Sequence, residues 1–142
     1  MIIKIARTEQ EKNDAFHVRM TVFVEEQHVP KDIELDTFDQ TAIHFIGYEN
    51  KNPIAASRLR FVDHYGKLER ICVLQTKRGK SFGKQMIQKM EEEIMKQGVT
   101  LAKLNAQVHA ISFYEQLGYQ VISEEFMDAG IPHVTMTKTI NN

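Results

Sequence analysis

Residues 68–84 constrain the fold of this chain more than any other segment. They begin with LERICVL, a largely apolar run typical of a partly buried strand, and from Phe82 the apolar residues recur at helical spacing. The turn between these patterns contains Gly79 and Gly83, which let backbone N–H groups approach a ligand without Cβ atoms in the way. The first N–H groups of a helix lack intrahelical partners, and the helix dipole favours negative charge there. The segment therefore predicts a binding site for phosphate or pyrophosphate.

Two common phosphate-binding loops do not fit this segment. A P-loop requires GxxxxGK[ST], and Gly79, Lys80 and Ser81 supply its end, but Leu74 occupies the position of its first glycine. The dinucleotide fingerprint GxGxxG also fails, because Gly79 and Gly83 lie four residues apart and no third glycine has the required spacing. An ATP-binding P-loop domain is therefore disfavoured.

Composition limits the class of protein. A chain of 142 residues has room for one domain, and its formal net charge of −1 lacks the basic surplus of a nucleic-acid binder. The single cysteine, Cys72, excludes an internal disulfide and a cysteine-based zinc site, and no histidine spacing indicates a metal. No apolar run approaches the roughly 18 residues of a membrane span, and Lys4 comes too early for a signal peptide. We expect a cytoplasmic protein without a metal, nucleic-acid or membrane partner.

Hydrophobic periodicity predicts the element order β, α, β, β, β, α, β, α, β, β. Strands are expected at residues 2–6, 42–48, 54–62, 68–74, 100–106, 119–123 and 134–139. Helices are expected at residues 8–26, 82–98 and 110–117, the first of them starting with a capping box of Thr8 and Glu11. Residues 27–40 contain Pro30 and many acids and are expected to form a loop with at most a short helix. The pattern favours an α/β (α+β) domain.

Two motifs resemble those of the GNAT superfamily of N-acetyltransferases. The acyl-CoA loop of that family is usually [QR]xxGx[GA]; aligned on Gly79, this chain has Thr76 and Ser81 at the other two positions. The second motif, NxxAxxxYxxxGF, is matched by Gln107, Ala110, Tyr114, Gly118 and Tyr119. The chain looks closest to a small bacterial subgroup with RICVL at 70–74, LNAQ at 104–107 and AGIPH at 129–133. The resemblance extends over residues 2–140.

The resemblance implies a fold and an activity. The GNAT fold is a mixed, mostly antiparallel sheet that splays apart between its fourth and fifth strands to admit the pantetheine arm of acetyl-CoA. Residues 1–142 are then one N-acetyltransferase domain that transfers an acetyl group to a primary amine by direct attack on the thioester. The acceptor is expected to be a small-molecule or peptide amine. Homodimers are frequent in this superfamily.

The resemblance also assigns residues to the cofactor. The backbone of residues 79–83 is expected to hold the pyrophosphate, with basic side chains near the other phosphates and main-chain groups of the strand 71–73 along the pantetheine arm. Gln107 replaces the usual asparagine, and Asn105 lies on the same side of the strand and is an alternative contact. The predicted cofactor residues are Ile71, Cys72, Val73, Arg78, Gly79, Lys80, Ser81, Phe82, Gly83, Lys84, Asn105, Gln107 and Phe113.

Tyr114 and Glu69 are the expected catalytic residues. Tyr114 stands where the family commonly protonates the leaving thiolate, and a phenol with a pKa near ~10 is a suitable donor; the alternative is a core tyrosine. Glu69 is expected to accept the amine proton, because strand alternation places it on the face of Ile71 and Val73 and an apolar neighbourhood would raise its pKa. An ion pair of Glu69 with a neighbouring basic residue, and deprotonation by water, remain alternatives.

Acceptor contacts are expected around the end of the first helix. Six acids between residues 25 and 39 indicate a wall that favours a cationic amine, although a solvated acidic loop has the same composition. Arg58 and Arg60 on the third strand equally allow an acceptor carboxylate to bind there. The predicted acceptor residues are Phe23, Glu26, Arg58, His109 and His133, the two histidines also for proton handling. Cys72 alternates against Ile71 and Val73 and is expected to be structural, not a nucleophile.

The alternative to an enzyme is an acyl-CoA-binding sensor that keeps the cofactor site without turnover. The replacement of asparagine by Gln107 favours it. A measurable loss of acetyl transfer on Tyr114→Phe would distinguish the enzyme from the sensor.

Overall fold

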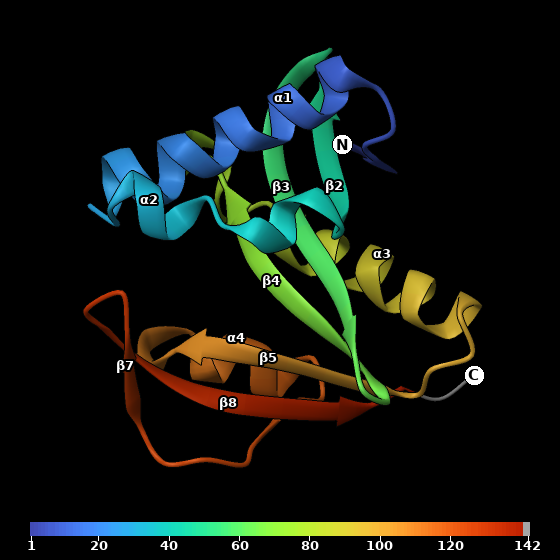
Figure 1. Ribbon diagram of the computed structural model, residues 1–142, viewed down its shortest axis with the longest axis vertical. Coiled ribbons are helices and arrows are strands. Elements are labelled where there is room, and N and C mark those ends of the chain that lie inside the picture. The colour runs from blue at the N-terminus through green and yellow to red at the C-terminus, as the bar shows by residue number, and fades with distance from the viewer. Residues whose placement is uncertain (141–142) are drawn as a thin grey trace.

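A mixed eight-stranded sheet runs through residues 1–140, the part of the chain that this computed structural model describes (Figure 1). The strand order is β1-β2-β3-β4-β5-β8-β6, with β7 paired to β8. The strands are β1 (Ile2–Ile5), β2 (Ile43–Glu49), β3 (Asn52–Val62), β4 (Tyr65–Val73), β5 (Leu101–Gln107), β6 (Gln120–Val121), β7 (Phe126–Asp128) and β8 (Ile131–Thr139). All neighbours are antiparallel except β4 and β5, which are parallel.

The helices connect the strands and end at the cavity described below. They are α1 (Glu9–Arg19), the π-helix η1 (Met20–Glu26), α2 (Lys31–Glu34), the 3-10 turns η2 (Thr37–Gln40), η3 (Gln75–Lys77) and η4 (Val108–Ala110), α3 (Phe82–Lys96) and α4 (Ile111–Gln116). The predicted capping box is confirmed, since the Thr8 hydroxyl accepts from the Glu11 N–H and the Glu11 carboxylate accepts from the Thr8 N–H. The predicted first helix has the expected length, but its last seven residues are π-helical.

Two hydrophobic clusters hold helices on the two faces of the sheet. Helix α1 packs on β2 and β3, with Ala15 and Val18 in a cluster that also contains Cys72 of β4. Helix α3 packs on β3 and β4 through a larger cluster that contains Met86 and Met90. Figure 1 shows α1 and α3 at the part of the sheet formed by β2, β3 and β4. The strands β4 and β5 are therefore covered by different helices where they separate.

The sheet splays apart between β4 and β5, which confirms the predicted fold. The two strands pair only from Tyr65↔Leu101 to Leu68↔Leu104, although β4 continues to Val73 and β5 to Gln107 (Figure 1). The separation begins at a β-bulge in β4: the register against β3 shifts there, and Arg70 has a φ of +57°. A bulge bends its strand and increases the local twist. The edge of β4 that faces β5 is consequently left without a partner strand within residues 1–140.

The sequence missed parts of the β3–β4 and β7–β8 hairpins. Strand β4 begins three residues before the predicted strand, because its connection to β3 is only the two residues Asp63 and His64. The strand predicted at residues 119–123 is reduced to β6, and β7 was not predicted. Strands β7 and β8 are joined by Ala129 and Gly130, both with positive φ. Asn-Gly is the usual sequence of this type of two-residue turn. Because alanine occupies its first position here, the sequence did not predict the turn.

Candidate active site

A cavity of about 960 Å³ occupies the splay between β4 and β5. One wall is the unpaired part of β4, and the opposite wall is the end of β5 with α4 and the β7–β8 turn. Helix η1 and α2 close the side that faces α1, and the loop before α3 borders the other end. Of the predicted site residues, all line this cavity except Lys80 and Arg58.

The loop before α3 presents free backbone donors to the cavity. Ser81 precedes the helix with a φ of +63°, and its side chain makes no capping hydrogen bond, so the first N–H groups of α3 are left for a ligand. Ser81, Gly83 and Lys84 line the cavity, whereas Lys80 is exposed outside it. The positive φ of Ser81 suits the middle glycine of [QR]xxGx[GA]. The structure therefore favours a different alignment of the motif over the one on Gly79. In it, Arg78 takes the [QR] position, Ser81 the first glycine position and Gly83 the [GA] position.

Arg78 ties this loop to η1. Its Nη1 and Nη2 donate to the Glu26 carboxylate, each at 2.7 Å, and its Nε donates to the Val73 carbonyl at 3.0 Å. The guanidinium lowers the pKa of Glu26, so the pair is charged at neutral pH. Arg78 and Glu26 thus compensate each other's charge. Neither remains as an unpaired charge that could bind a phosphate or an amine.

Tyr114 of α4 lies in the cavity wall with an apolar surround. Its ring packs edge-on against Phe113 and Tyr119, with centroid separations of 5.1 and 6.0 Å. Burial raises the pKa of Tyr114 to about 12. The phenol is therefore protonated at neutral pH and can donate a proton or a hydrogen bond to a group in the cavity.

The amide side chains at the end of β5 are held in place by neighbours. Gln107 donates through Nε2 to Gln27 at 2.9 Å, and its Oε1 lies 2.6 Å from Nε2 of His109. Asn105 accepts from the Thr135 hydroxyl at 2.9 Å. Both residues line the cavity, so the longer side chain of Gln107 is accommodated by a contact to η1 that the sequence did not indicate.

The environment of Glu69 is the reverse of the expected one. Its carboxylate contacts Arg58, Arg60 and Lys67 at 2.8 to 3.1 Å, and these cations hold its pKa at about 2 against the burial that would raise it. The bulge at Arg70 also breaks strand alternation. Glu69 contacts Arg58, which in turn contacts Asp36 and Asp39, whereas Ile71 and Val73 pack against the cluster of α3. The expectation of a raised pKa on the face of Ile71 is therefore wrong, and the ion-pair alternative is the one observed.

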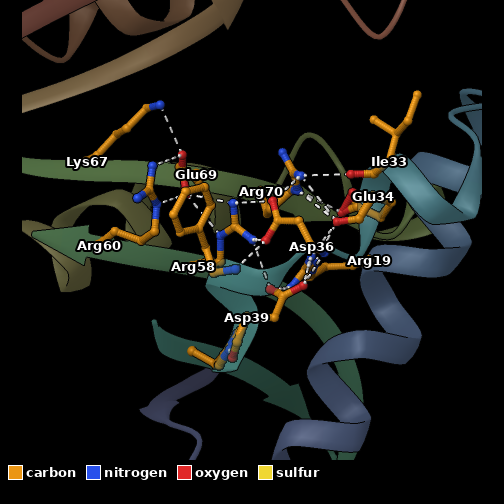
Figure 2. A network of polar contacts seen from close by, with 12 residues as sticks. Arg19, Ile33, Glu34, Asp36, Asp39, Arg58, Arg60, Lys67, Glu69 and Arg70 are labelled. Atoms are coloured by element: carbon orange, nitrogen blue, oxygen red, sulfur yellow. Dashed lines mark hydrogen bonds and ion pairs between the residues drawn. The ribbon is translucent and has the colours of Figure 1, made fainter. Parts of the chain in front are cut away.

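Figure 2 shows that Glu69 belongs to a larger group of charges, here called the charged cluster. Its members are Arg19, Glu34, Asp36, Asp39, Arg58, Arg60, Lys67, Glu69 and Arg70. Arg58 is 1% exposed, contacts three carboxylates and does not line the cavity, so it is not positioned to bind an acceptor. The acids at residues 34, 36 and 39 are likewise paired with arginines. The expected acidic wall for a cationic amine is therefore wrong.

The remaining predicted residues surround the cavity without forming ion pairs. His133 is 8% exposed, and its Nδ1 lies 2.6 Å from the Ile131 carbonyl, which fixes the ring. Phe23 of η1 and Phe113 of α4 add apolar surface. The thiol of Cys72 faces the cluster of α1, and burial raises its pKa to about 12, so it is a thiol and a poor nucleophile.

Several cavity residues were not predicted. Lys67 and Arg70 of β4 and Glu34 of α2 line the cavity, Gln27 orients Gln107, and Asp128 precedes the β7–β8 turn. Lys67 precedes and Arg70 follows Glu69 in β4. The bulge at Arg70 is a tertiary feature that the sequence pattern did not predict.

Acid is expected to destabilise the fold through the charged cluster. Asp39 and Glu69 both have a pKa of about 2, below their ordinary values, because arginines bind their charged forms. Their contribution to stability is complete above about pH 5 and is lost as the pH falls toward 2. Glu34 acts in the opposite direction, because burial raises its pKa. Urea unfolding at pH 7, 5, 4 and 3 should show a falling free energy of unfolding; an equal value at pH 7 and pH 3 would contradict the expectation.

Within residues 1–140 there is neither a grouping of metal ligands nor a membrane-spanning helix. No three His, Cys, Asp or Glu side chains in this range are grouped so that they could hold a metal ion. None of the described helices has the length and hydrophobicity needed to cross a bilayer.

Known proteins resemble this chain in sequence and in fold. A sequence model of the acetyltransferase (GNAT) domain matches residues 5–140. A Bacillus subtilis relative named uncharacterized N-acetyltransferase YjcF is 44% identical over 135 residues, which are 94% of this chain and 96% of the relative. The crystal structure of an acyl-CoA N-acyltransferase from Pseudomonas aeruginosa superposes with a TM-score of 0.87 at 23% identity, covering 97% of each chain. An aminoglycoside 6'-N-acetyltransferase solved with coenzyme A has a TM-score of 0.79 at 16% identity, covering 100% of this chain and 98% of that chain.

These matches confirm the resemblance inferred from the two motifs. The family match covers nearly the whole chain, and the splayed mixed sheet is the fold of the solved neighbours. The chain therefore belongs to the GNAT acetyltransferase family and is an N-acetyltransferase.

Proposed function

We propose that residues 1–142 form one domain that transfers an acetyl group from acetyl-CoA to an amine in the cavity between β4 and β5. The observation that carries this proposal is the unpaired edge of β4 that runs to the free N-terminus of α3. An extended pantetheine arm can pair with that edge as an added strand, and its pyrophosphate then reaches unsatisfied N–H groups. The neighbour solved with coenzyme A has the same fold, which supports a coenzyme A thioester as the acyl donor.

The chain's own groups supply the chemistry of transfer. An unprotonated amine attacks the thioester carbonyl and forms a C–N bond, while the carbonyl oxygen gains the negative charge. A free backbone N–H of β4 at the splay stabilises that oxyanion. When the C–S bond breaks, the Tyr114 hydroxyl gives its proton to the CoA sulfur. The new amide nitrogen loses its extra proton to water, and water returns a proton to the Tyr114 phenolate, so that the amide, CoA and the starting form of the enzyme result. The apolar surround of Tyr114 keeps it protonated until this step.

The amine proton leaves through water in this proposal. An amine with a pKa near ~10 must lose a proton before attack. Glu69, with a pKa of about 2, binds a proton too weakly to remove it directly at neutral pH. Water in the open cavity can carry the proton to solvent, which was the alternative to Glu69.

Binding of acetyl-CoA is the first test. Calorimetric titration with acetyl-CoA, CoA and Mg-ATP should show binding of the two CoA species in the micromolar range and none of Mg-ATP. Failure to bind either CoA species would overturn the proposed cofactor site. Binding without acetylation of any amine would instead support the sensor.

Replacing Gly83 by valine is expected to weaken acetyl-CoA binding about tenfold or more. A Cβ at Gly83 lies 3.5 Å from Phe113, which is ordinary contact, so the fold tolerates it. The larger valine side chain would occupy cavity space at the N-terminus of α3, where the pyrophosphate is proposed to bind. Lys89→Val, on the same helix outside the cavity, is the matched control. An unchanged dissociation constant for Gly83→Val would place the pyrophosphate elsewhere.

A further inference from the structure

The charged cluster has an excess of positive charge. It contains five cations, Arg19, Arg58, Arg60, Lys67 and Arg70, and four carboxylates, Glu34, Asp36, Asp39 and Glu69. Partly buried charges are screened less by salt and water than exposed ones. The position of the uncompensated cation within the cluster therefore affects which ligands can bind beside it.

The interior of the cluster is compensated. Arg19, 0% exposed, donates to Glu34 and Asp39, and Arg58 contacts Asp36, Asp39 and Glu69. Neither arginine lines the cavity. Each of these two buried arginines thus has at least two carboxylate partners, so the excess charge does not lie on either of them.

The excess lies on the cavity wall, at Lys67 and Arg70. Each of these side chains is 23% exposed and lines the cavity. Lys67 has one ionic contact, at 3.1 Å to a Glu69 carboxylate that Arg58 and Arg60 already share. Arg70 directs Nε and Nη2 to Glu34, Ile33 and Asp36, and its Nη1 makes no hydrogen bond within residues 1–140. Figure 2 shows the Lys67 amine directed at the Glu69 carboxylate.

The other charged residues on the cavity either are paired or belong to other walls. Glu26 is neutralised by Arg78, and Lys77 by Glu49 outside the cavity. Lys84 lies at the end where the phosphates are proposed to bind. Asp128 is exposed on the strand across the cavity and makes no ion pair within the described residues. On the β4 wall, Lys67 and Arg70 thus keep donors that no carboxylate within residues 1–140 uses.

We infer that the acceptor is an amine that also carries a carboxylate, which binds to Lys67 and Arg70. This inference rests on the proposed acetyl transfer and names its substrate class. A carboxylate there gains charge-assisted hydrogen bonds from the Lys67 ammonium and the free Nη1 of Arg70. It also offsets the excess charge of the cluster. A diamine or polyamine would place a second cation against the same two residues and is disfavoured.

The test compares amines that differ only in this group. Acetylation of each L-amino acid and of 6-aminohexanoate is measured by CoA release, beside the corresponding carboxamide and 1,5-diaminopentane. The best acid is expected to exceed its amide in kcat/KM by about tenfold or more, since one charge-assisted hydrogen bond has that effect. The diamine is expected to react more slowly than that acid.

The variant Lys67→Gln should remove most of this preference by raising KM for the acid while leaving the amide unchanged. Lys67→Arg should retain it. Lys103→Gln is the matched control, because Lys103 is the register partner of Lys67 on β5 but does not line the cavity.

Two results would overturn the inference. One is that no carboxylate-bearing amine is acetylated faster than its amide. The other is an unchanged ratio of acid to amide in both Lys67→Gln and Arg70→Gln. Failure of the proposed function is seen separately, because it appears as a lack of acetyl-CoA binding to the wild-type protein before any amine is added.

Discussion

Replacement of Arg58 by methionine should lower the free energy of unfolding by about 3–5 kcal/mol. Arg58 is 1% exposed and contacts Asp36, Asp39 and Glu69 at 2.7 to 3.0 Å. Its removal leaves three partly buried carboxylates with less compensation, and burial penalises such charges strongly. Domains of this size are stable by only about 5–15 kcal/mol, so the loss is a large fraction of the total. Urea unfolding followed by circular dichroism measures it.

A surface ion pair provides the control for Arg58. Lys89 contacts Glu92 at 3.7 Å, and the two side chains are 43% and 55% exposed. Lys89→Met should change the free energy of unfolding by less than about 1 kcal/mol, as exposed pairs generally do. Equal stability of Arg58→Met and the wild type would mean that desolvation of the cluster cancels its attraction. The cluster would then not contribute to stability.

Tyr114→Phe is expected to lower kcat roughly a hundredfold or more, the usual contribution of a general acid. Affinity for acetyl-CoA should stay nearly unchanged, because phenylalanine keeps the ring that packs against Phe113 and Tyr119. Without the hydroxyl, the thiolate must leave unprotonated or take its proton from water. Steady-state kinetics with an amine found in the acceptor panel, together with calorimetric titration, separates the two effects.

Tyr65→Phe is the matched control for Tyr114. Tyr65 lies at the start of β4, where β4 and β5 still pair, and it does not line the cavity. Its loss of a hydroxyl should leave kcat unchanged. Equal kcat values for Tyr114→Phe and the wild type would remove Tyr114 from the mechanism, and a weakened acetyl-CoA affinity alone would make it a binding residue.

Much of the fold followed from local patterns in the sequence. The capping box at Thr8, the apolar spacing from Phe82 and the alternation within residues 42–62 each depend on neighbours a few positions away. Such signals are present in the sequence itself. The β7–β8 hairpin was missed because Ala129 takes a positive φ that other residues adopt more readily. At this position the folded structure imposes a φ that the local backbone preference of alanine disfavours.

The residues of the candidate site likewise divide into those that local motifs predict and those that they do not. The loop of Gly79 to Gly83 and the position of Tyr114 could be predicted, because both lie in short motifs with fixed spacing. The role of Glu69 could not be predicted. Its partners Arg58 and Arg60 come from another strand, and the bulge at Arg70 changes which face Glu69 occupies.

The sequence by itself determined the family, most of the element order and the position of the glycine-containing loop before α3, since each is encoded by spacing along the chain. Only the tertiary structure decided which charges remain free. The acids of residues 34–39 and the arginines of β3 and β4 are far apart in sequence, and folding pairs them. Ion pairs depend on distances of a few ångströms, which the sequence does not contain. That pairing removed the expected acidic wall and left Lys67 and Arg70 as the cations facing the cavity beside α2.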